Sequence, residues 1–340
     1  MSETSTAREA DEASGTREAP EIGEMGQMGE TGRTGEPFDV VVVGAGPAGL
    51  NAALVCGRQR RRVLLIDSGR PRNAPSPETH MLLSRDGFSP AALRAAARAD
   101  LAAYATVETR AGEVTDARAL DCGFELVLAD GRVEHTRKLI LATGQVDVLV
   151  DIPGLAERFG RGVFHCPFCH GYETRDMPLA VVGSDPASVM LARYVADRFT
   201  DDVVLATHGQ APTDEQCALL AKAGVGLRVE QLTSITGEPG SLTLEFATGS
   251  PLARGAVFHR TRIHQHSALA ARLGCAHLPD GCVRVDEFQR TSVPGVFAAG
   301  DMARLEALPD PLTFVVTGAA DGARAAVWAD QEMFRADAGL

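Results

Sequence analysis

A glycine-rich turn between two apolar segments is the feature that most constrains this fold. Residues 38–43 (Phe-Asp-Val-Val-Val-Val) form a continuous apolar run that is typical of a central parallel strand. The motif Gly-Ala-Gly-Pro-Ala-Gly follows at 44–49, and a helical stretch continues from it to residue 58. A second strand at 63–66 ends in Asp67, so the sequence predicts a βαβ unit with an acid about 20 positions after the glycines.

Each glycine of this motif has a physical role. The first permits a tight turn, the second lets the backbone approach a pyrophosphate, and the third lets the helix pack on the strand. The pyrophosphate then faces N–H groups at the helix N-terminus, and the terminal acid accepts hydrogen bonds from a ribose. This motif does not distinguish NAD from FAD. The residues expected at the dinucleotide are Gly44, Gly46, Pro47, Ala48, Gly49 and Asp67.

A strand near the C-terminus favours FAD. Residues 293–301 are apolar and end in Gly300-Asp301, and this Asp can reach the ribityl–phosphate region once the chain returns to the first domain. A second strand–turn–helix pattern begins at 179–183. We therefore expect an α/β protein with two Rossmann-like domains, each of three layers (ββα), the second inserted into the first.

The composition suggests where the domains begin and end. Residues 1–37 are rich in Glu, Gly, Thr and Ser, which predicts a disordered tail. A proline-containing hinge follows the first strands near residue 150. We expect two FAD-binding segments at 38–150 and 283–340, and an inserted nucleotide-type domain at 151–282.

Charge and hydropathy exclude several classes of partner. The formal net charge is −12, and residues 1–37, with nine acidic and three basic side chains, contribute −6 of it. No basic face is indicated, so nothing favours nucleic acid. No run of 18 apolar residues and no apolar leader segment is present, so we expect a cytoplasmic protein with no membrane partner.

The segment Cys166-Pro167-Phe168-Cys169-His170 carries the most chemistry. Two thiols two residues apart can close into an easily reduced disulfide, which is a two-electron switch. A c-type haem would need export, a closed zinc site would need two more ligands, and inert packing is the third alternative. We favour the redox disulfide and expect no metal.

Other cysteines and histidines have less specific patterns. His165 and His170 can stabilise a thiolate or shuttle its proton, although a structural hydrogen bond explains His165 equally well. The remaining cysteines occur singly and are predicted to be small buried residues. They are Cys56, Cys122, Cys217, Cys275 and Cys282.

The second glycine motif is incomplete. Asp185 stands where the second glycine of a dinucleotide-binding turn would be, and two like charges ~4 Å apart repel by ~4 kcal/mol. The next strand ends in Ala-Thr-His-Gly at 206–209, without the arginines that hold a 2′-phosphate. We predict that NADPH is not used in the usual way, with weak binding by an atypical loop as the alternative.

With these motifs in hand, the chain resembles the low-molecular-weight thioredoxin reductase family of flavoproteins over residues 38–335. The resemblance rests on the first glycine motif, on Ala-Thr-Gly at 142–144, on the cysteine pair and on residues 291–301. It implies bound FAD and a homodimer. It also implies FAD contacts by Val114, Ala142, Thr143, Gly144, Gly300 and Asp301.

The departures from ordinary thioredoxin reductases resemble the FAD-dependent dithiol oxidases of the gliotoxin and holomycin type. His170 replaces an Asp, and a Gln that often opens the last FAD-contacting helix is replaced near Phe314. This resemblance implies that Cys169 lies nearer the flavin and that Cys166 meets substrate. It also places four further residues along the FAD, two of which (Arg72 and Asn73) are equally explained as turn residues. The four are Ser68, Arg72, Asn73 and His80.

The expected activity is oxidation of a small-molecule dithiol, a natural product in antibiotic biosynthesis, with O2 as acceptor and H2O2 as product. Cys166 and Cys169 exchange the disulfide, and His170 is the candidate general base because a group titrating near neutrality suits thiol deprotonation. One alternative is a disulfide reductase driven by NADPH or another donor, and another is a non-catalytic redox sensor. His264 and His266 are candidates for the substrate pocket, although surface positions explain them better.

Overall fold

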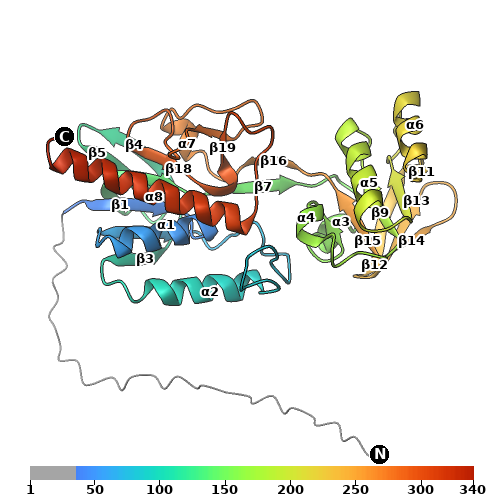
Figure 1. Cartoon of the computed structure of the whole chain (residues 1–340), viewed down its shortest axis with the longest axis horizontal. Helices are drawn as coiled ribbons and strands as arrows, with labels where there is room; N and C mark the ends of the chain where they lie inside the picture. Colours follow the sequence, from blue (N-terminus) through green and yellow to red (C-terminus); the bar gives the residue numbers. More distant parts are fainter. Residues whose placement is uncertain (1–35) are drawn as a thin grey trace, which may run out of the picture. The chain divides into compact units, whose positions relative to one another are not determined.

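The glycine motif lies at the centre of a seven-stranded sheet (Figure 1). The computed structural model describes residues 36–340, so the expectation of a disordered tail concerns residues outside this range. The strands are ordered β3-β2-β1-β6-β5-β4, with β18 also paired to β6; β4 and β5 are antiparallel and the rest are parallel. The bounds are β1 (Phe38–Val43), β2 (Val63–Asp67), β3 (Val107–Ala111), β4 (Val114–Leu120), β5 (Gly123–Leu128), β6 (Val133–Leu141) and β18 (Val296–Ala298).

Both faces of this sheet are buried, which explains the uninterrupted apolar run in β1. Val40 and Val42 belong to one core cluster and Val41 and Val43 to another, because successive side chains point to opposite faces. The first cluster includes residues of α1, α2 and α8, and the second includes residues of β4, β5 and α7. The helices are α1 (Pro47–Arg58), α2 (Pro90–Leu101), α7 (Leu269–Arg272) and α8 (Val315–Asp337).

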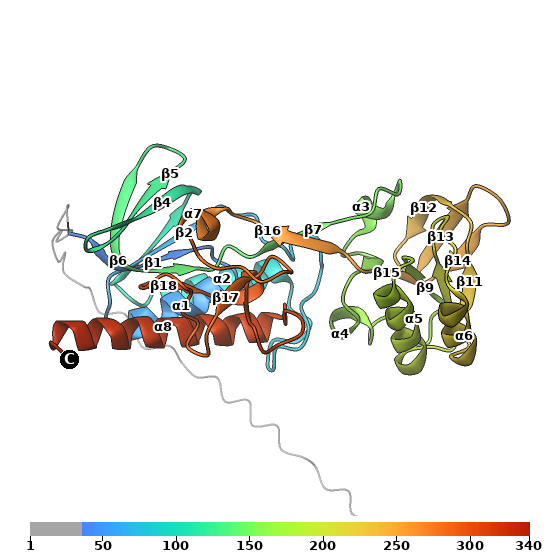
Figure 2. The ribbon, with the colours of Figure 1, turned by 90° about the horizontal axis from the view of Figure 1, so that it is seen from above.

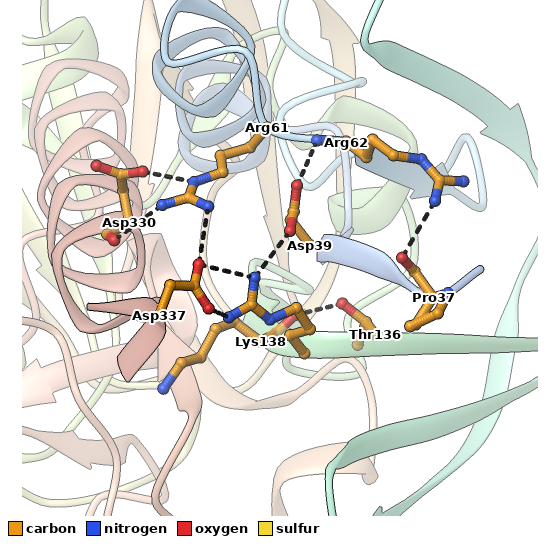
Figure 3. A network of polar contacts seen from close by, with 9 residues as sticks. Pro37, Asp39, Arg61, Arg62, Thr136, Lys138, Asp330 and Asp337 are labelled. Carbon is orange, nitrogen blue, oxygen red and sulfur yellow. Dashed lines mark hydrogen bonds and ion pairs between the residues drawn. The ribbon is translucent and has the colours of Figure 1, made fainter. Parts of the chain in front are cut away.

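The C-terminal helix α8 runs alongside α1 (Figures 1 and 2). A Cβ atom built on Gly322 would lie 1.9 Å from the carbonyl oxygen of Ala48, so the glycine permits this close contact. Figure 3 shows a polar network at the far end of α8, where Arg61 donates to Asp330 at 2.6 Å. Arg137 bridges Asp337 of this helix to Asp39 of β1. The network ties α8 to the first βαβ unit.

A second Rossmann-like unit is built on a five-stranded parallel sheet in the order β11-β10-β9-β15-β8. One face packs on α5 and α6, and the other packs on the antiparallel strands β12, β13 and β14. Its strands are β8 (Val163–Phe164), β9 (Leu179–Val182), β10 (Val203–Ala206), β11 (Gly226–Arg228), β12 (Leu232–Glu238), β13 (Ser241–Phe246), β14 (Leu252–Arg254) and β15 (Ala256–His259). Its helices are α3 (Leu155–Arg158), α4 (Pro167–His170), α5 (Pro186–Arg198) and α6 (Asp214–Lys222).

Two antiparallel strands, β7 (Gln145–Val148) and β16 (Arg262–Gln265), join the two units. The predicted return to the first unit at residue 283 is too late. Leu269, Ala270 and Cys275 belong to the first unit's core, where α7 packs against β4, so the return follows β16 directly. The remaining elements are β17 (Val283–Val285), the 3-10 helix η1 (Gly300–Met302) and β19 (Ala303–Leu305).

The predicted fold class is confirmed, but the expectation that all five single cysteines are buried holds for three of them. Cys122 is exposed because it sits in the turn between β4 and β5, and Cys217 is half-buried on α6, whereas the other three single cysteines are buried. None of the helices between residues 36 and 340 has the length and hydropathy that crossing a bilayer requires.

Candidate functional site

One pocket lies where β1, β2, β6 and β18 end, and it brings together residues that are far apart in sequence. It extends from Asp67 and Val114 to Cys169 and His170. Of the predicted cofactor contacts, only Gly49 does not line it. The predicted contacts that do are Gly44, Gly46, Pro47, Ala48, Asp67, Ser68, Arg72, Asn73, His80, Val114, Ala142, Thr143, Gly144, Gly300 and Asp301.

The three motif glycines have distinct surroundings. A Cβ atom on Gly44, whose φ is +103°, would lie 2.3 Å from the carbonyl oxygen of Ala142. A Cβ on Gly49 would lie 1.7 Å from the carbonyl oxygen of Gly44, so this glycine closes the turn from outside the pocket. A Cβ on Gly46 would meet nothing within 4 Å. The turn is therefore tight on its inner side and open where a pyrophosphate approaches.

Polar atoms without partners mark the end of the pocket near the cysteines. Thr79 Oγ1, His80 Nε2 and His170 Nδ1 are all buried and make no hydrogen bond. Buried polar groups in native proteins are rarely left unpaired. Thr79 Oγ1 fits a polar ring system such as the isoalloxazine of FAD, and the open Gly46 turn fits its pyrophosphate.

The structure joins Cys166 and Cys169 in a disulfide, as predicted. The pair lies at the start of the short helix α4, where the backbone N–H of Cys169 donates to Cys166 Sγ at 3.1 Å. Cys169 lines the pocket, and Cys166 does not and is only 9% exposed. The two sulfurs therefore have different surroundings, and only the residue Cys169 of the pair forms part of the pocket wall.

The imidazole of His170 has a defined tautomer. Its ring stacks on Phe164 with centroids 4.3 Å apart, and Nε2 lies 3.1 Å from Ser76 Oγ. The Ser76 hydroxyl already donates its proton to the carbonyl oxygen of Glu78 at 2.7 Å, so it can only accept from the histidine. Nε2 therefore carries the proton, and the unpartnered Nδ1 is the basic nitrogen.

Burial, together with smaller contributions from the neighbouring His165 and His80, lowers the pKa of His170 from 6.5 to about 4. The expectation that this group titrates near neutrality is therefore wrong for the disulfide form. The ring is neutral at pH 7 and free to accept a proton at Nδ1.

This shift predicts a dependence of stability on pH. A histidine whose pKa is lower in the folded chain opposes folding once the unfolded chain becomes protonated, so its effect is absent above pH 6.5 and grows as the pH falls toward about 4. The full shift corresponds to at most about 3 kcal/mol. We expect His170→Gln to flatten the decline in melting temperature between these pH values, with His135→Gln, on the surface of β6, as the control. An unchanged decline would contradict the low pKa.

Arg72 links the pocket to the strand that leads into the second unit. Its guanidinium donates to both carboxylate oxygens of Asp147 on β7 at 2.7 Å and to Asp301 Oδ2 at 2.9 Å. Burial alone would raise the pKa of Asp147, but the bonds from Arg72 outweigh it and the pKa is lowered. Thr261 Oγ1 also donates to Asp147 at 2.7 Å. The sequence did not reveal Asp147, because a single acid on a strand carries no motif.

The histidines that the sequence singled out are in different environments. His80 and His266 line the pocket, whereas His264 is exposed on β16. His165 also lines it and stacks on Phe159, with ring centroids 5.8 Å apart. Phe314 lines it too, at the start of α8, and its ring lies 6.0 Å from that of Phe168.

The side chain of Asp185 occupies the helix N-terminus that follows the second glycine motif. Its carboxylate accepts from the backbone N–H of Ser188 at 2.8 Å and caps α5. A Cβ on Gly183 would lie 2.1 Å from Ser188 Oγ, so the turn is tight here as well. The helix terminus that would face a pyrophosphate is held by the chain's own carboxylate. Among residues 36–340, no three His, Cys, Asp or Glu side chains are grouped as a metal site.

Comparisons with known proteins agree with this geometry. The family model described as pyridine nucleotide-disulphide oxidoreductase matches residues 38–327. Thioredoxin reductase tcpT of Claviceps purpurea is 34% identical over 275 residues, which cover 77% of this chain and 86% of the relative. Thioredoxin reductase sirT of Leptosphaeria maculans is 33% identical, covering 78% and 87%.

Solved structures have the same fold. The crystal structure of HlmI is 40% identical, has a TM-score of 0.82, and covers 89% of this chain and 94% of its own. The family predicted from the motifs is thus confirmed, and with it the flavin cofactor. The chain belongs to the pyridine nucleotide-disulphide oxidoreductase family, as a thioredoxin reductase-like, FAD-binding thiol–disulfide oxidoreductase.

Proposed function

We propose that the protein is an FAD-dependent dithiol oxidase that closes a disulfide in a small natural product and passes the electrons to O2. One observation carries this proposal: a disulfide opens onto the flavin pocket in a chain whose second dinucleotide motif is capped by its own Asp185. Electrons can enter from a thiol, whereas the usual entry from NADPH lacks a binding turn.

We expect the residues of the pocket to hold FAD along its length. The open turn at Gly46 and the N-terminus of α1 fit the pyrophosphate, and Asp67 fits the adenosine ribose. Asp67 is oriented for this, because Oδ1 accepts from the N–H of Ala45 at 3.1 Å and Oδ2 from Arg98 at 2.8 Å. Asp301 fits the ribityl end. When bound, FAD accepts two electrons from a thiol pair and passes them to O2.

The chain's own residues perform the thiol exchange. A substrate thiolate attacks Cys166 Sγ, the Cys166–Cys169 bond breaks, and Cys169 leaves as a thiolate. The substrate's second thiol loses its proton and attacks the mixed disulfide, which releases Cys166 and closes the product disulfide. Over one turnover, the substrate loses two electrons and two protons, and O2 accepts both pairs to form H2O2. His170 Nδ1 is the group placed to accept a thiol proton.

The burial of Cys166 favours a compact substrate. This sulfur belongs to a residue that is only 9% exposed, so a small dithiol reaches it more easily than a thiol on a protein surface. The exposed rings of Phe168, which lies between the two cysteines, and of Tyr172, which follows His170 by two residues, offer an apolar surface to such a molecule.

The proposal is tested by oxygen uptake with dithiothreitol in the absence of NADPH. We expect sustained uptake and one H2O2 for each dithiol oxidised, with no stimulation by NADPH. An anaerobic NADPH titration, followed at the flavin absorbance band, should leave the flavin oxidised. Rapid reduction of the flavin by NADPH would overturn the proposal.

The names of the relatives favour a second candidate, a disulfide reductase supplied by NADPH or another donor. It requires the second glycine motif to accept a dinucleotide despite Asp185. The same anaerobic titration separates the candidates, and Asp185→Asn provides a matched variant, because the amide can still cap α5 without its charge. If the wild type is a reductase, flavin reduction by NADPH is fast in both proteins.

A further inference from the structure

His80 and Asp86 form a histidine–carboxylate pair near His170, and the exchange steps above do not use it. His80 lines the pocket, its side chain is 12% exposed, and its ring lies perpendicular to that of His170 with centroids 6.2 Å apart. Nδ1 lies 3.4 Å from Asp86 Oδ2. Asp86 is well exposed, so the pair connects the pocket wall to water.

The loop from 79 to 88 is built around this pair. Thr79 and Phe88 form an antiparallel bridge, and the backbone N–H of Met81 donates to Asp86 Oδ1 at 2.8 Å. Met81 has a φ of +66°, a conformation that non-glycine residues rarely adopt. Several contacts together hold Asp86 against His80 despite the unfavourable backbone at Met81. Such locally strained backbone is concentrated at functional sites.

The other ring nitrogen of His80 lies among carboxylates. Nε2 is buried without a hydrogen bond, and it lies 3.4 Å from Glu78 Oε2 and 3.7 Å from Glu173 Oε1. The carbonyl of Glu78 also accepts from Ser76, the residue that receives the Nε2 proton of His170. Ser76 contacts His170, and Glu78 contacts both Ser76 and His80, so these two residues connect the two imidazoles.

We propose that His80 and Asp86 form a proton relay that carries the proton taken up by His170 out to solvent. The inference rests on the proposed thiol exchange, in which each substrate thiol gives up its proton near His170. The proton enters at His170 Nδ1, and His170 releases one from Nε2 to Ser76 Oγ. The Ser76 hydroxyl turns from the Glu78 carbonyl and gives its own proton to His80 Nε2, and His80 releases one from Nδ1. Asp86 then exchanges it with water. No electrons move along this path, and each histidine ends each passage neutral.

The environment of His170 explains why a relay is needed. Burial leaves this imidazole with little affinity for a proton, so it cannot store one through a turnover. A base with such a low proton affinity can act in each turnover only if another group takes the proton from it. The groups around His80 suit the next step, because carboxylates of Glu78, Asp86 and Glu173 surround its ring.

The test uses the FAD-loaded enzyme and dithiothreitol under anaerobic conditions. Rapid quenching with an alkylating reagent counts the opened Cys166–Cys169 disulfides, and stopped-flow absorbance follows the flavin separately. We expect His80→Ala to slow disulfide opening at least about 10-fold, because general acid–base groups contribute more than this to rates. Added imidazole should restore much of the rate, whereas pyrazole, which has the same shape but little basicity, should not.

The controls separate a relay from a structural role. His135→Ala is the matched variant, because His135 also lies 3.4 Å from a carboxylate, Glu125, but on the surface of β6. It should open at the wild-type rate. If His80→Ala fails to retain FAD, Asp86→Asn provides the measurement, because its amide oxygen can still accept from Met81; it should slow opening several-fold and increase the solvent deuterium isotope effect.

Two results would overturn the relay: a wild-type opening rate in both the His80 and the Asp86 variant, or equal rescue by imidazole and pyrazole. Its failure is distinguishable from failure of the oxidase proposal, because the anaerobic assay contains no O2. Absence of oxygen uptake by the wild-type enzyme would overturn the oxidase and leave the relay measurement intact.

Discussion

Replacing either cysteine of the disulfide by serine should reduce dithiol oxidation to the rate of free flavin, a loss of at least about 1,000-fold. Serine cannot form the disulfide that the substrate thiolate attacks, so no part of the exchange is preserved. Cys166 and Cys169 act as one unit, and the double variant should be no slower than either single one. The measurement is oxygen uptake with dithiothreitol, at equal flavin content by absorbance.

The two single variants differ in a way that the geometry predicts. Of the two sulfurs, only that of Cys169 lines the pocket, so Cys166→Ser leaves a thiol facing this pocket and Cys169→Ser leaves one outside it. A change in the flavin absorbance spectrum at high pH is therefore expected in Cys166→Ser alone. Cys122→Ser, at an exposed turn, should match the wild type in both assays. Equal spectra in the two variants would contradict the assignment of Cys169 to the flavin side.

The pocket was predictable from sequence where a backbone motif dictates it. Gly46 leaves the turn open to a ligand, whereas the glycines at 44 and 49 are needed because a strand, a turn and a helix approach within the space that a Cβ would fill. The same holds for Gly300, whose Cβ would lie 2.9 Å from the Cβ of Ala48. Such constraints are local and therefore visible in the order of residues.

The contacts made by single side chains were not predictable. Ser76 fixes the tautomer of His170 across 94 positions of sequence, and Asp147 meets Arg72 across 75. Neither residue belongs to a pattern, because their partners are set by how β7 and the loop after β2 pack in three dimensions. The error about the pKa of His170 has the same origin, since burial by Phe164 is a property of the packed chain.

Arg72→Met should destabilise the folded protein by about 3–5 kcal/mol, the usual cost of removing one partner from a buried ion pair. Asp147 is 6% exposed, and among residues 36–340 the hydroxyl of Thr261 is the side-chain hydrogen-bond partner that would remain. Arg72→Lys should recover little, because one ammonium cannot span both oxygens of Asp147 and reach Asp301. Melting temperature by circular dichroism and release of flavin fluorescence measure the effect on the chain and on the cofactor.

The charge left on Asp147, rather than the lost side chain, is the main source of this cost. Adding Asp147→Asn to Arg72→Met should therefore recover much of the stability, because a neutral amide can still pair with Thr261. Arg118→Met is the control, since its bond to Glu125 is at the surface, where an arginine that is 68% exposed contributes at most about 1 kcal/mol. If Arg72→Met has the same melting temperature as Arg118→Met, the bonds from Arg72 do not stabilise the position of β7. If the double variant is no more stable than Arg72→Met, the loss comes from packing, and the guanidinium acts by filling the space between Asp147 and Asp301.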